Sequence, residues 1–80
     1  MPKLKVLSGN DLIKIFSLFG FVIQSQKGSH IKLSKISLNQ KQVLIIPNHK
    51  EIDIGTLKAI YRQANKYVSE KDLFPFFYSE

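Results

Sequence analysis

Cysteine is absent from the 80 residues of this chain. Its absence excludes a disulfide framework and a thiolate metal site, so the fold has to be stabilised by packing and hydrogen bonds. A signal peptide and an apolar stretch of about 20 residues are also missing, and the longest apolar run is residues 43–47. We therefore expect a soluble, cytoplasmic protein that has no role in a membrane.

The sequence contains no internal repeat, and no linker rich in proline or glycine divides it. Apolar residues make up 44% of it, which is enough for one thin core, since a chain of this length buries only about 60% of the surface that it exposes when unfolded. The sequence therefore predicts a single domain over residues 1–80.

Acidic residues are scarce in this sequence. Six Asp and Glu stand against twelve Lys and Arg, which gives a formal net charge of +6. This balance suits a polyanionic partner, and nucleic acid is the first candidate. The alternative explanation is solubility alone, because many small basic proteins bind no polyanion.

The first helix is predicted from its two ends and from an apolar stripe. Ser8 is a favourable N-cap, and Asp11 gives a capping box with an acid at the positive end of the helix dipole. Gly20 is a typical left-handed stop. The helix should therefore span residues 9–19, with a stripe of four side chains in the core: Leu12, Ile15, Phe16 and Phe19.

Three β-prone runs follow, at residues 21–26, 30–35 and 42–47. A Gly28-Ser29 turn and a polar loop at residues 37–41 separate them, and such short connections favour an antiparallel meander. The third run is apolar at each of positions 43–46. Something other than this chain's own helices is therefore expected to cover one of its faces, which indicates a partner.

A second helix is predicted near Gly55, with its core side at Leu57, Ile60, Tyr61 and Ala64. Its other side carries Lys58, Arg62 and Lys66 at a spacing of four, with no acid between positions 55 and 68. Like charges at this spacing repel, and a bound polyanion would remove that penalty. The alternative is an ordinary solvated face.

The C-terminal segment combines a helix start with many aromatic residues. Ser69 with Asp72 repeats the capping signal, while Pro75 should limit this helix to about one turn. The aromatic tail, residues 74–78, either folds back over the core or docks a partner.

These elements define an α+β fold in the order α-β-β-β-α. We expect a three-stranded antiparallel sheet with two helices on one face and a short C-terminal helical tail, which is the order of the double-stranded RNA-binding domain.

A candidate working site lies at Lys27-Gly28-Ser29-His30. Because side chains alternate along a strand, His30 and Lys32 should share the face opposite Ile31. RNA carries its own nucleophile, the 2′-hydroxyl, so an enzyme has to supply positioning, proton transfer and charge stabilisation. An imidazole can transfer the proton. The two lysines and the backbone N–H groups of Gly28 and Ser29 could hold the phosphate oxygens.

Other readings of the two histidines remain open. His30 could be an ordinary surface residue in a turn. His49 is either a second proton carrier or a structural loop residue. Two histidines without a cluster of carboxylates make a poor metal site, so no metal or other cofactor is expected. Ser29 has no evident base and acid to complete a hydrolase triad.

Several short motifs occur together in this order: Ser8-Gly9, Leu18-Phe19-Gly20-Phe21, Lys27-Gly28-Ser29-His30, Pro47-Asn48-His49 and Gly55-Thr56-Leu57-Lys58-Ala59-Ile60. In this order and spacing, over residues 4–78, the chain resembles the HicA toxins of HicA/HicB toxin–antitoxin modules. The polar loop near residues 35–41 departs from the tighter turn often found in relatives. The resemblance implies a metal-independent endoribonuclease that cleaves translated mRNA, with His30 as catalytic residue and a HicB-like antitoxin as inhibitor.

The resemblance also leads to expectations about surfaces. Lys27, Gly28, Ser29, Lys32, Lys58 and Arg62 are expected to bind RNA. The antitoxin should be acidic where it touches, should cover His30 or the approach across Lys27 and Lys32, and should gain apolar contact from residues 43–46 and 74–78. Two rival functions remain, a non-catalytic RNA-binding module and a subunit that only meets an acidic protein.

Overall fold

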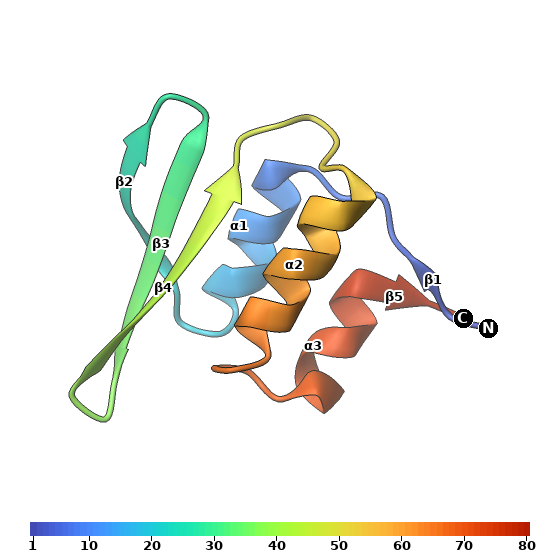
Figure 1. The fold of residues 1–80 in the computed structure, drawn as a ribbon. Helices are drawn as coiled ribbons and strands as arrows, with labels where there is room; N and C mark the ends of the chain where they lie inside the picture. Colours follow the sequence, from blue (N-terminus) through green and yellow to red (C-terminus); the bar gives the residue numbers. More distant parts are fainter.

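A computed structural model describes all 80 residues of the chain as an α+β fold. The elements, in chain order, are β1 (Lys3–Leu4), α1 (Gly9–Ser17), β2 (Val22–Lys27), β3 (His30–Ser37), β4 (Gln40–Pro47), α2 (Ile54–Ala64), α3 (Glu70–Phe77) and β5 (Tyr78–Ser79). Strands β2, β3 and β4 form an antiparallel sheet in that order, and β1 pairs with β5 in a separate ribbon (Figure 1). No helix is long and apolar enough to cross a membrane.

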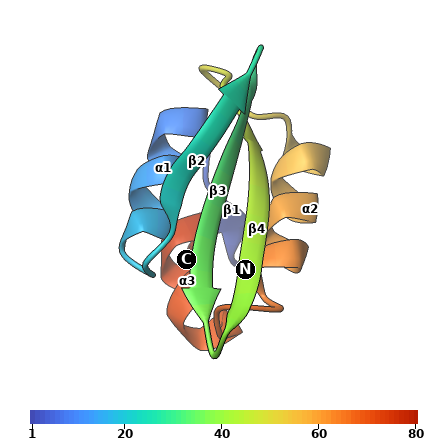
Figure 2. The ribbon, with the colours of Figure 1, turned by 90° about the vertical axis from the view of Figure 1, so that its left-hand side faces the viewer.

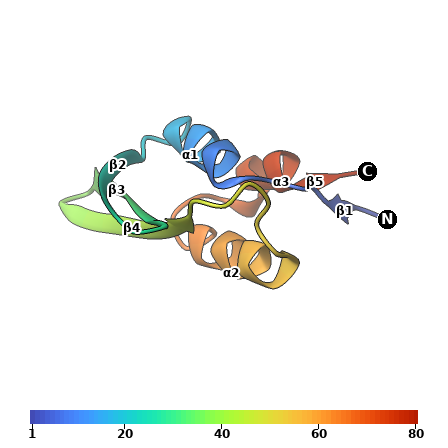
Figure 3. The ribbon, with the colours of Figure 1, turned by 90° about the horizontal axis from the view of Figure 1, so that it is seen from above.

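The helices lie on one side of the sheet. α1 and α2 cover one sheet face, and α3 packs on the side of these two helices that is away from the sheet (Figure 3). The Phe77 ring of α3 lies with its centroid 6.1 Å from that of Phe16 and 5.0 Å from that of Tyr61. The predicted fold resembling the double-stranded RNA-binding domain is confirmed, and its second sheet face is uncovered (Figure 2).

The ends of α1 follow from its sequence. The Asp11 N–H donates to the Ser8 hydroxyl at 3.0 Å, and the Ser8 N–H donates to the Asp11 carboxylate at 2.9 Å, so the predicted capping box is present. Gly20 has a φ of +93°, which confirms the left-handed stop. The half-buried Lys35 donates through Nζ to the Phe19 carbonyl at 2.8 Å, which places a cation at the negative end of the helix.

The sheet shows the predicted alternation of side chains. Its inner face buries Ile31, Leu33, Leu44 and Ile46 under the helices. His30 and Lys32 alternate with these residues and therefore lie on the outer face. The apolar core and the candidate site are thus on opposite sides of β3.

The predicted polar loop at residues 37–41 is wrong. Strands β3 and β4 continue to Ser37 and Gln40, and only Leu38 and Asn39 connect them. Both turn residues have positive φ, 53° and 63°, as in the two-residue turns whose twist matches that of a hairpin. Asn39 tolerates this conformation well, whereas the 93% exposed Leu38 gives no turn signal in the sequence.

α2 buries the predicted stripe of Leu57, Ile60, Tyr61 and Ala64. Asp53 caps its first turn by accepting from the Thr56 N–H at 3.0 Å. Lys58 and Arg62 are exposed on the helix, while Lys66 lies in the turn that follows Ala64 rather than on the helix itself. The three cations still form one exposed row, called here the α2 basic row.

The expectation that Pro75 limits the last helix to about one turn is wrong. α3 runs for eight residues through Pro75. A proline at this place removes one hydrogen bond, to the carbonyl four residues earlier in the exposed first turn. The fully buried Leu73 and Phe77 fix the helix on the core on either side of it.

The aromatic tail folds back over the core. Phe74, Phe76 and Tyr78 are half-buried, and the Phe74 and Tyr78 rings stack at 4.9 Å. The start of the chain pairs with this tail, because Leu4 lies opposite Tyr78 and the Lys5 N–H donates to the Phe77 carbonyl at 2.7 Å. Most of the apolar surface of the tail is therefore used within the chain.

We predict that Asp11→Asn lowers the free energy of unfolding at about pH 7 by a few tenths of a kcal/mol, up to about 1 kcal/mol. Hydrogen bonds from the backbone N–H and the hydroxyl of Ser8 lower the pKa of Asp11 in the folded protein. A carboxyl with a lowered folded pKa stabilises the fold above its unfolded value of about 3.9, and this contribution is lost as the pH falls through the folded value. Urea unfolding of both proteins should therefore show a difference that narrows towards about pH 2.

The control is Asp72→Asn, at the corresponding position of α3. Here the Asp72 N–H donates to Ser69, but no hydrogen bond returns to the carboxylate. At about pH 7, Asp72→Asn should lower the free energy of unfolding by less than Asp11→Asn does. The prediction would be contradicted if Asp11→Asn lowered the free energy of unfolding by the same amount at about pH 7 and at about pH 2.

Candidate functional site

The candidate site is built on the turn between β2 and β3. Lys27 and His30 form the last pair of this hairpin, with Gly28 and Ser29 between them. Gly28 has a φ of +60°, and open space surrounds the place where a Cβ would stand. The Gln26 side-chain amide donates to the Gly28 carbonyl at 3.1 Å, while the Gly28 and Ser29 N–H groups donate to no protein acceptor. Two N–H groups are therefore free at an exposed turn.

The backbone of His30 is fixed from the side of β4. His30 lies opposite Pro47, and the Asn48 N–H donates to the Ser29 carbonyl at 2.6 Å, so the pairing of β3 with β4 extends into the turn. The imidazole itself is exposed and makes no hydrogen bond to the protein. No pocket encloses it. A rigid strand start thus presents an open imidazole, which suits a large substrate better than a small enclosed one.

Helix α1 holds the same corner through the next residues. The Gly9 N–H donates to the His49 carbonyl at 2.9 Å. Gly9 is buried, and a Cβ on it would collide with the Pro47 carbonyl oxygen and would lie 3.0 Å from the Asn48 Cα. The absence of a side chain at Gly9 therefore lets the start of α1 meet the end of β4 directly.

His49 has its structural contact through the backbone. Its carbonyl binds α1, whereas its side chain is exposed and makes no hydrogen bond. The Thr56 N–H and then the Thr56 hydroxyl lower the pKa of Asp53, and the charge of nearby His49 adds to this effect. The imidazole of His49 thus stands free near a carboxylate that caps α2. No group of three or more potential metal ligands lies together anywhere in the chain.

Both histidines belong to one end of the molecule. The β2–β3 turn, the loop from β4 to α2, and the starts of α1 and α2 all lie at the top of Figure 1. The positive ends of two helices therefore point to the same end as the imidazoles, although Asp11 and Asp53 cap both.

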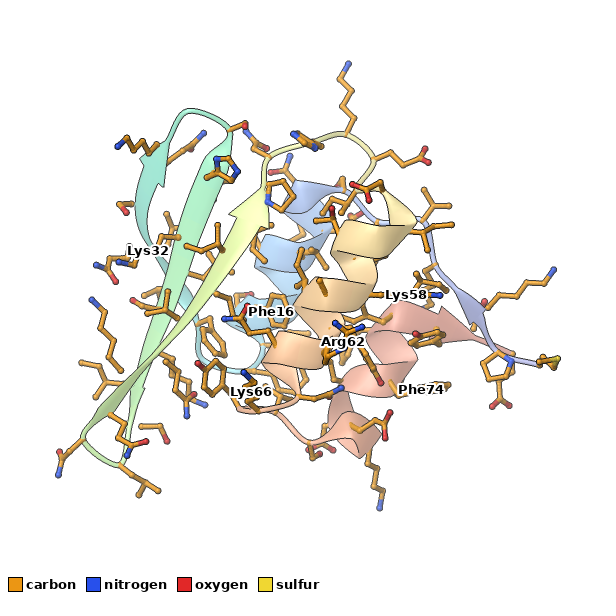
Figure 4. The ribbon with its side chains drawn as sticks, in the orientation of Figure 1. Phe16, Lys32, Lys58, Arg62, Lys66 and Phe74 are labelled. Carbon is orange, nitrogen blue, oxygen red and sulfur yellow. The ribbon has the colours of Figure 1, made fainter.

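The predicted RNA-binding residues fall into two separate sets. Lys27, Gly28, Ser29 and His30 occupy the turn, and Lys32 follows on the outer sheet face. Lys58 and Arg62 lie on α2, on a different side of the molecule from Lys32 (Figure 4). The structure does not bring these two sets together.

The sequence analysis assigns no structural role to three residues of this region, although two of them, Gly9 and Asn48, belong to its motifs. Asp53 could have been found, because Asp three residues before Thr56 is a normal N-cap signal. The contacts of Gly9 and Asn48 could not have been found from the sequence, because backbone atoms make both contacts. Only the folded chain brings these segments together.

The chain matches the model of a known protein family. Residues 9–66, more than half of the chain, match the family described as HicA toxin of bacterial toxin-antitoxin. No curated protein and no solved structure is matched. The matched range runs from the start of α1 to the turn after α2, and so includes the β2–β3 turn, β4 and the α2 basic row.

We predict that Gly9→Ala destabilises the fold by about 1–3 kcal/mol, because the new methyl group meets backbone atoms of Pro47 and Asn48 that cannot rotate away. The amide NMR signals of Ser29 and Asn48 should shift with it. Gly55→Ala is the matched control, since its Cβ would make an ordinary contact of 3.5 Å with Asp53. The control should raise stability by roughly 0.5 kcal/mol through helix propensity. Equal urea midpoints for Gly9→Ala and the unchanged chain would refute the close approach.

Proposed function

The chain belongs to the HicA toxins of bacterial toxin–antitoxin modules, and on that basis we propose that it is a metal-independent endoribonuclease that cleaves mRNA. His30 is the catalytic residue in this proposal, and a HicB-like antitoxin is the inhibitor. One observation carries it: the exposed imidazole is on a strand start that is paired on both sides, directly after two N–H groups without a protein acceptor and opposite a lysine in the hairpin.

The reaction needs little from the protein. The 2′-oxygen of the RNA attacks the adjacent phosphorus, the 2′-O–P bond forms, and the bond from phosphorus to the 5′-oxygen breaks. The 2′-hydroxyl loses one proton and the 5′-oxygen gains one. His30 moves one of these two protons, which contributes a factor of about 10² to 10⁴ in rate. The RNA supplies its own tethered nucleophile.

The β2–β3 turn supports this reaction by holding the phosphate. The N–H groups of Gly28 and Ser29 donate to no protein acceptor at this exposed turn, and a phosphate oxygen can accept from them. Lys27 is paired with His30 across the hairpin, and Lys32 follows on the same outer face. These cations oppose the negative charge that grows on the phosphate oxygens.

The second candidate function is a non-catalytic RNA-binding module. The α2 basic row favours it, because phosphates could bind there without any contribution from His30. Incubation of RNA with the purified protein in EDTA separates the candidates. Cleavage supports the ribonuclease, and retention of RNA without cleavage supports the binding module. If RNA is neither cleaved nor retained, the remaining function is a subunit that binds only a protein.

An external inhibitor fits the open site. Because no pocket or lid encloses His30, inhibition in the toxin–antitoxin module has to come from a surface that covers the β2–β3 turn. The net charge of +6 favours an antitoxin that is acidic where it touches.

We predict that His30→Ala abolishes RNA cleavage and toxicity and leaves the fold intact, because the side chain is exposed and makes no hydrogen bond. His49→Ala should have a milder effect, since its carbonyl contact with Gly9 does not depend on the side chain. Cleavage assays with circular dichroism as a folding control measure both. Full cleavage by His30→Ala would reject the assignment, and a larger loss with a folded His49→Ala would reverse the ranking of the histidines.

We predict that Lys58→Glu with Arg62→Glu weakens RNA binding and flattens its salt dependence. Each lost phosphate contact reduces the slope of log affinity against log salt by somewhat under one unit. Lys3→Glu with Lys71→Glu is the control, because it changes the net charge equally at exposed positions on β1 and α3. If both double variants show the slope of the unchanged chain, the α2 basic row is only a solvated face.

A further inference from the structure

The two edge strands of the sheet differ in regularity. β2 pairs with β3 through an irregularity between Ile23 and Ser25, which marks a bulge. β4 pairs with β3 without interruption from Gln40 to Pro47. Bulges are one of the devices that prevent an edge from pairing with another chain. The free edge of β4 is therefore the better template for an added strand.

The hydrogen-bonding groups on this edge can be assigned. The Gln63 side-chain amide of α2 donates to the Val43 carbonyl at 3.4 Å, so this carbonyl points away from β3. The N–H and C=O of one residue in an antiparallel strand point to the same side, and the side alternates along the strand. Lys41, Val43 and Ile45 therefore direct their N–H groups outward. Pro47, which has no N–H, ends the row opposite His30.

The side chains along this edge are apolar and accessible. Ile45 is 46% exposed and Val43 is half-buried, and both lie on the outer sheet face. Lys41 and Pro47 protect the two ends of this edge, and the Gln63 amide covers the Val43 carbonyl, but residues 42–46 contain no lysine, no proline and no bulge. The prediction that residues 43–46 need a cover from outside is consistent with this surface.

Two residues of the α2 basic row, Arg62 and Lys66, lie on the same side of the molecule as this edge, whereas Lys58 lies farther from β4 (Figure 4). Gln63 reaches β4 from α2, and Arg62, about 100° away around the helix, points more towards solvent. β4 and α2 face the viewer together in Figure 1, and Arg62 and Lys66 lie along that side in Figure 4. The helix has no acidic residue of its own to neutralise these cations. A strand added to β4 would therefore run past a row of positive charge.

We propose that the outer edge of β4, together with Arg62 and Lys66, binds an extended acidic segment of the antitoxin, which joins the sheet as a fourth strand. The identity of the partner rests on the proposed function, whereas the chemistry of the surface does not. Alternate side chains of the segment continue the outer apolar surface of Val43 and Ile45. The side chains between them point to the α2 side, where carboxylates meet Arg62 and Lys66.

The location explains how such binding would inhibit the enzyme. Pro47 lies directly opposite His30, and neighbouring strands are about 4.8 Å apart. A segment on the outer edge of β4 at Pro47 is therefore roughly two strand spacings, or about 10 Å, from the start of β3. A short continuation of the partner across the outer face would cover the imidazole.

A second copy of this chain fits the edge less well. Pairing two β4 edges would bring two chains of charge +6, and their α2 basic rows, to the same interface. Like charges at such short range oppose association. An acidic segment removes this repulsion, which is why the occupant is assigned to a partner of opposite charge.

The first experiment uses a capped peptide of alternating glutamate and valine, about as long as β4. Amide hydrogen exchange of the toxin, measured by NMR at about ten times the peptide dissociation constant, should slow about tenfold at Lys41, Val43 and Ile45. The outward amides of β2, at Ile23 and Gln26, should not change. A peptide of alternating lysine and valine should give no protection. The proposal would be overturned if the peptide slowed exchange at neither edge of the sheet. It would also be overturned if the peptide slowed exchange at β2 instead of β4, or at α2 without β4.

Variants test the two parts of the surface. Val43→Pro removes the central outward N–H but no bond to β3, so it should fold and lose peptide binding, and Val43→Thr should retain it. Arg62→Glu and Lys66→Glu should each weaken binding by roughly two- to fivefold, whereas Lys71→Glu on α3 should not. Peptide binding by a folded Val43→Pro as tight as that of the unchanged chain would overturn strand addition.

RNA cleavage assays on the same proteins separate this proposal from the proposed function. A folded Val43→Pro should still cleave RNA and should resist a co-expressed HicB-like antitoxin at concentrations that silence the unchanged chain. Complete inhibition of this variant would overturn the docking site while leaving the ribonuclease assignment in place. If no form of the protein cleaves RNA, the proposed function fails, and the exchange experiment still decides the docking site.

Discussion

A backbone junction at residues 47–49 holds the working end of this protein together. Pro47 pairs with His30, the Asn48 N–H binds the carbonyl of Ser29, and the His49 carbonyl binds the N–H of Gly9. β3, β4 and α1 are thereby fixed to one another within three residues. Because main-chain groups make these contacts, the side chains of His30, Asn48 and His49 stay exposed and available for chemistry.

These side chains can stay exposed because each surface of the sheet has one purpose. The inner face holds the core under α1 and α2, the outer face carries His30 and Lys32, and the edge of β4 keeps a row of unpaired N–H groups. No buried residue is polar or charged except at the backbone. A chain that buries so little surface cannot easily stabilise a buried charged site. Its candidate functional groups therefore lie outside the core, where a partner can reach them.

The sequence predicts those parts of the fold that depend on local chemistry. The caps of α1 and α3, the stop at Gly20, the stripe of α2 and the orientation of His30 all follow from side-chain periods and from hydrogen bonds within a few residues. The turn at Leu38 could not be predicted because leucine has no preference for positive φ, and the pairing of β3 with β4 determines its conformation. Pro75 is accepted inside α3 because Leu73 and Phe77 are anchored in a core that is built from distant segments.

The candidate site, too, has one part that follows from local sequence and another that depends on distant segments of the chain. The turn residues Lys27 to His30 are adjacent in sequence, and their arrangement follows from the hairpin. The pairing of β1 with β5, and the contact of Gly9 with Pro47, join segments far apart in the chain through backbone atoms, which have the same chemistry in every residue. No pattern of residue types can specify such contacts on its own.

The separation of the two basic surfaces bears on how one small domain would distinguish RNA from its inhibitor. In the proposed function RNA would use the cations of α2 and of the β2–β3 turn, but its phosphates have no donors with which to continue a β-ladder. This electrostatic attraction weakens steeply with salt, because counterions are released when phosphates bind. An acidic strand would use the same cations and also the N–H row of β4, whose hydrogen bonds depend much less on salt. The two partners would then exclude each other at Arg62, and the edge of β4 would give the preference to the antitoxin at the ionic strength of a cell.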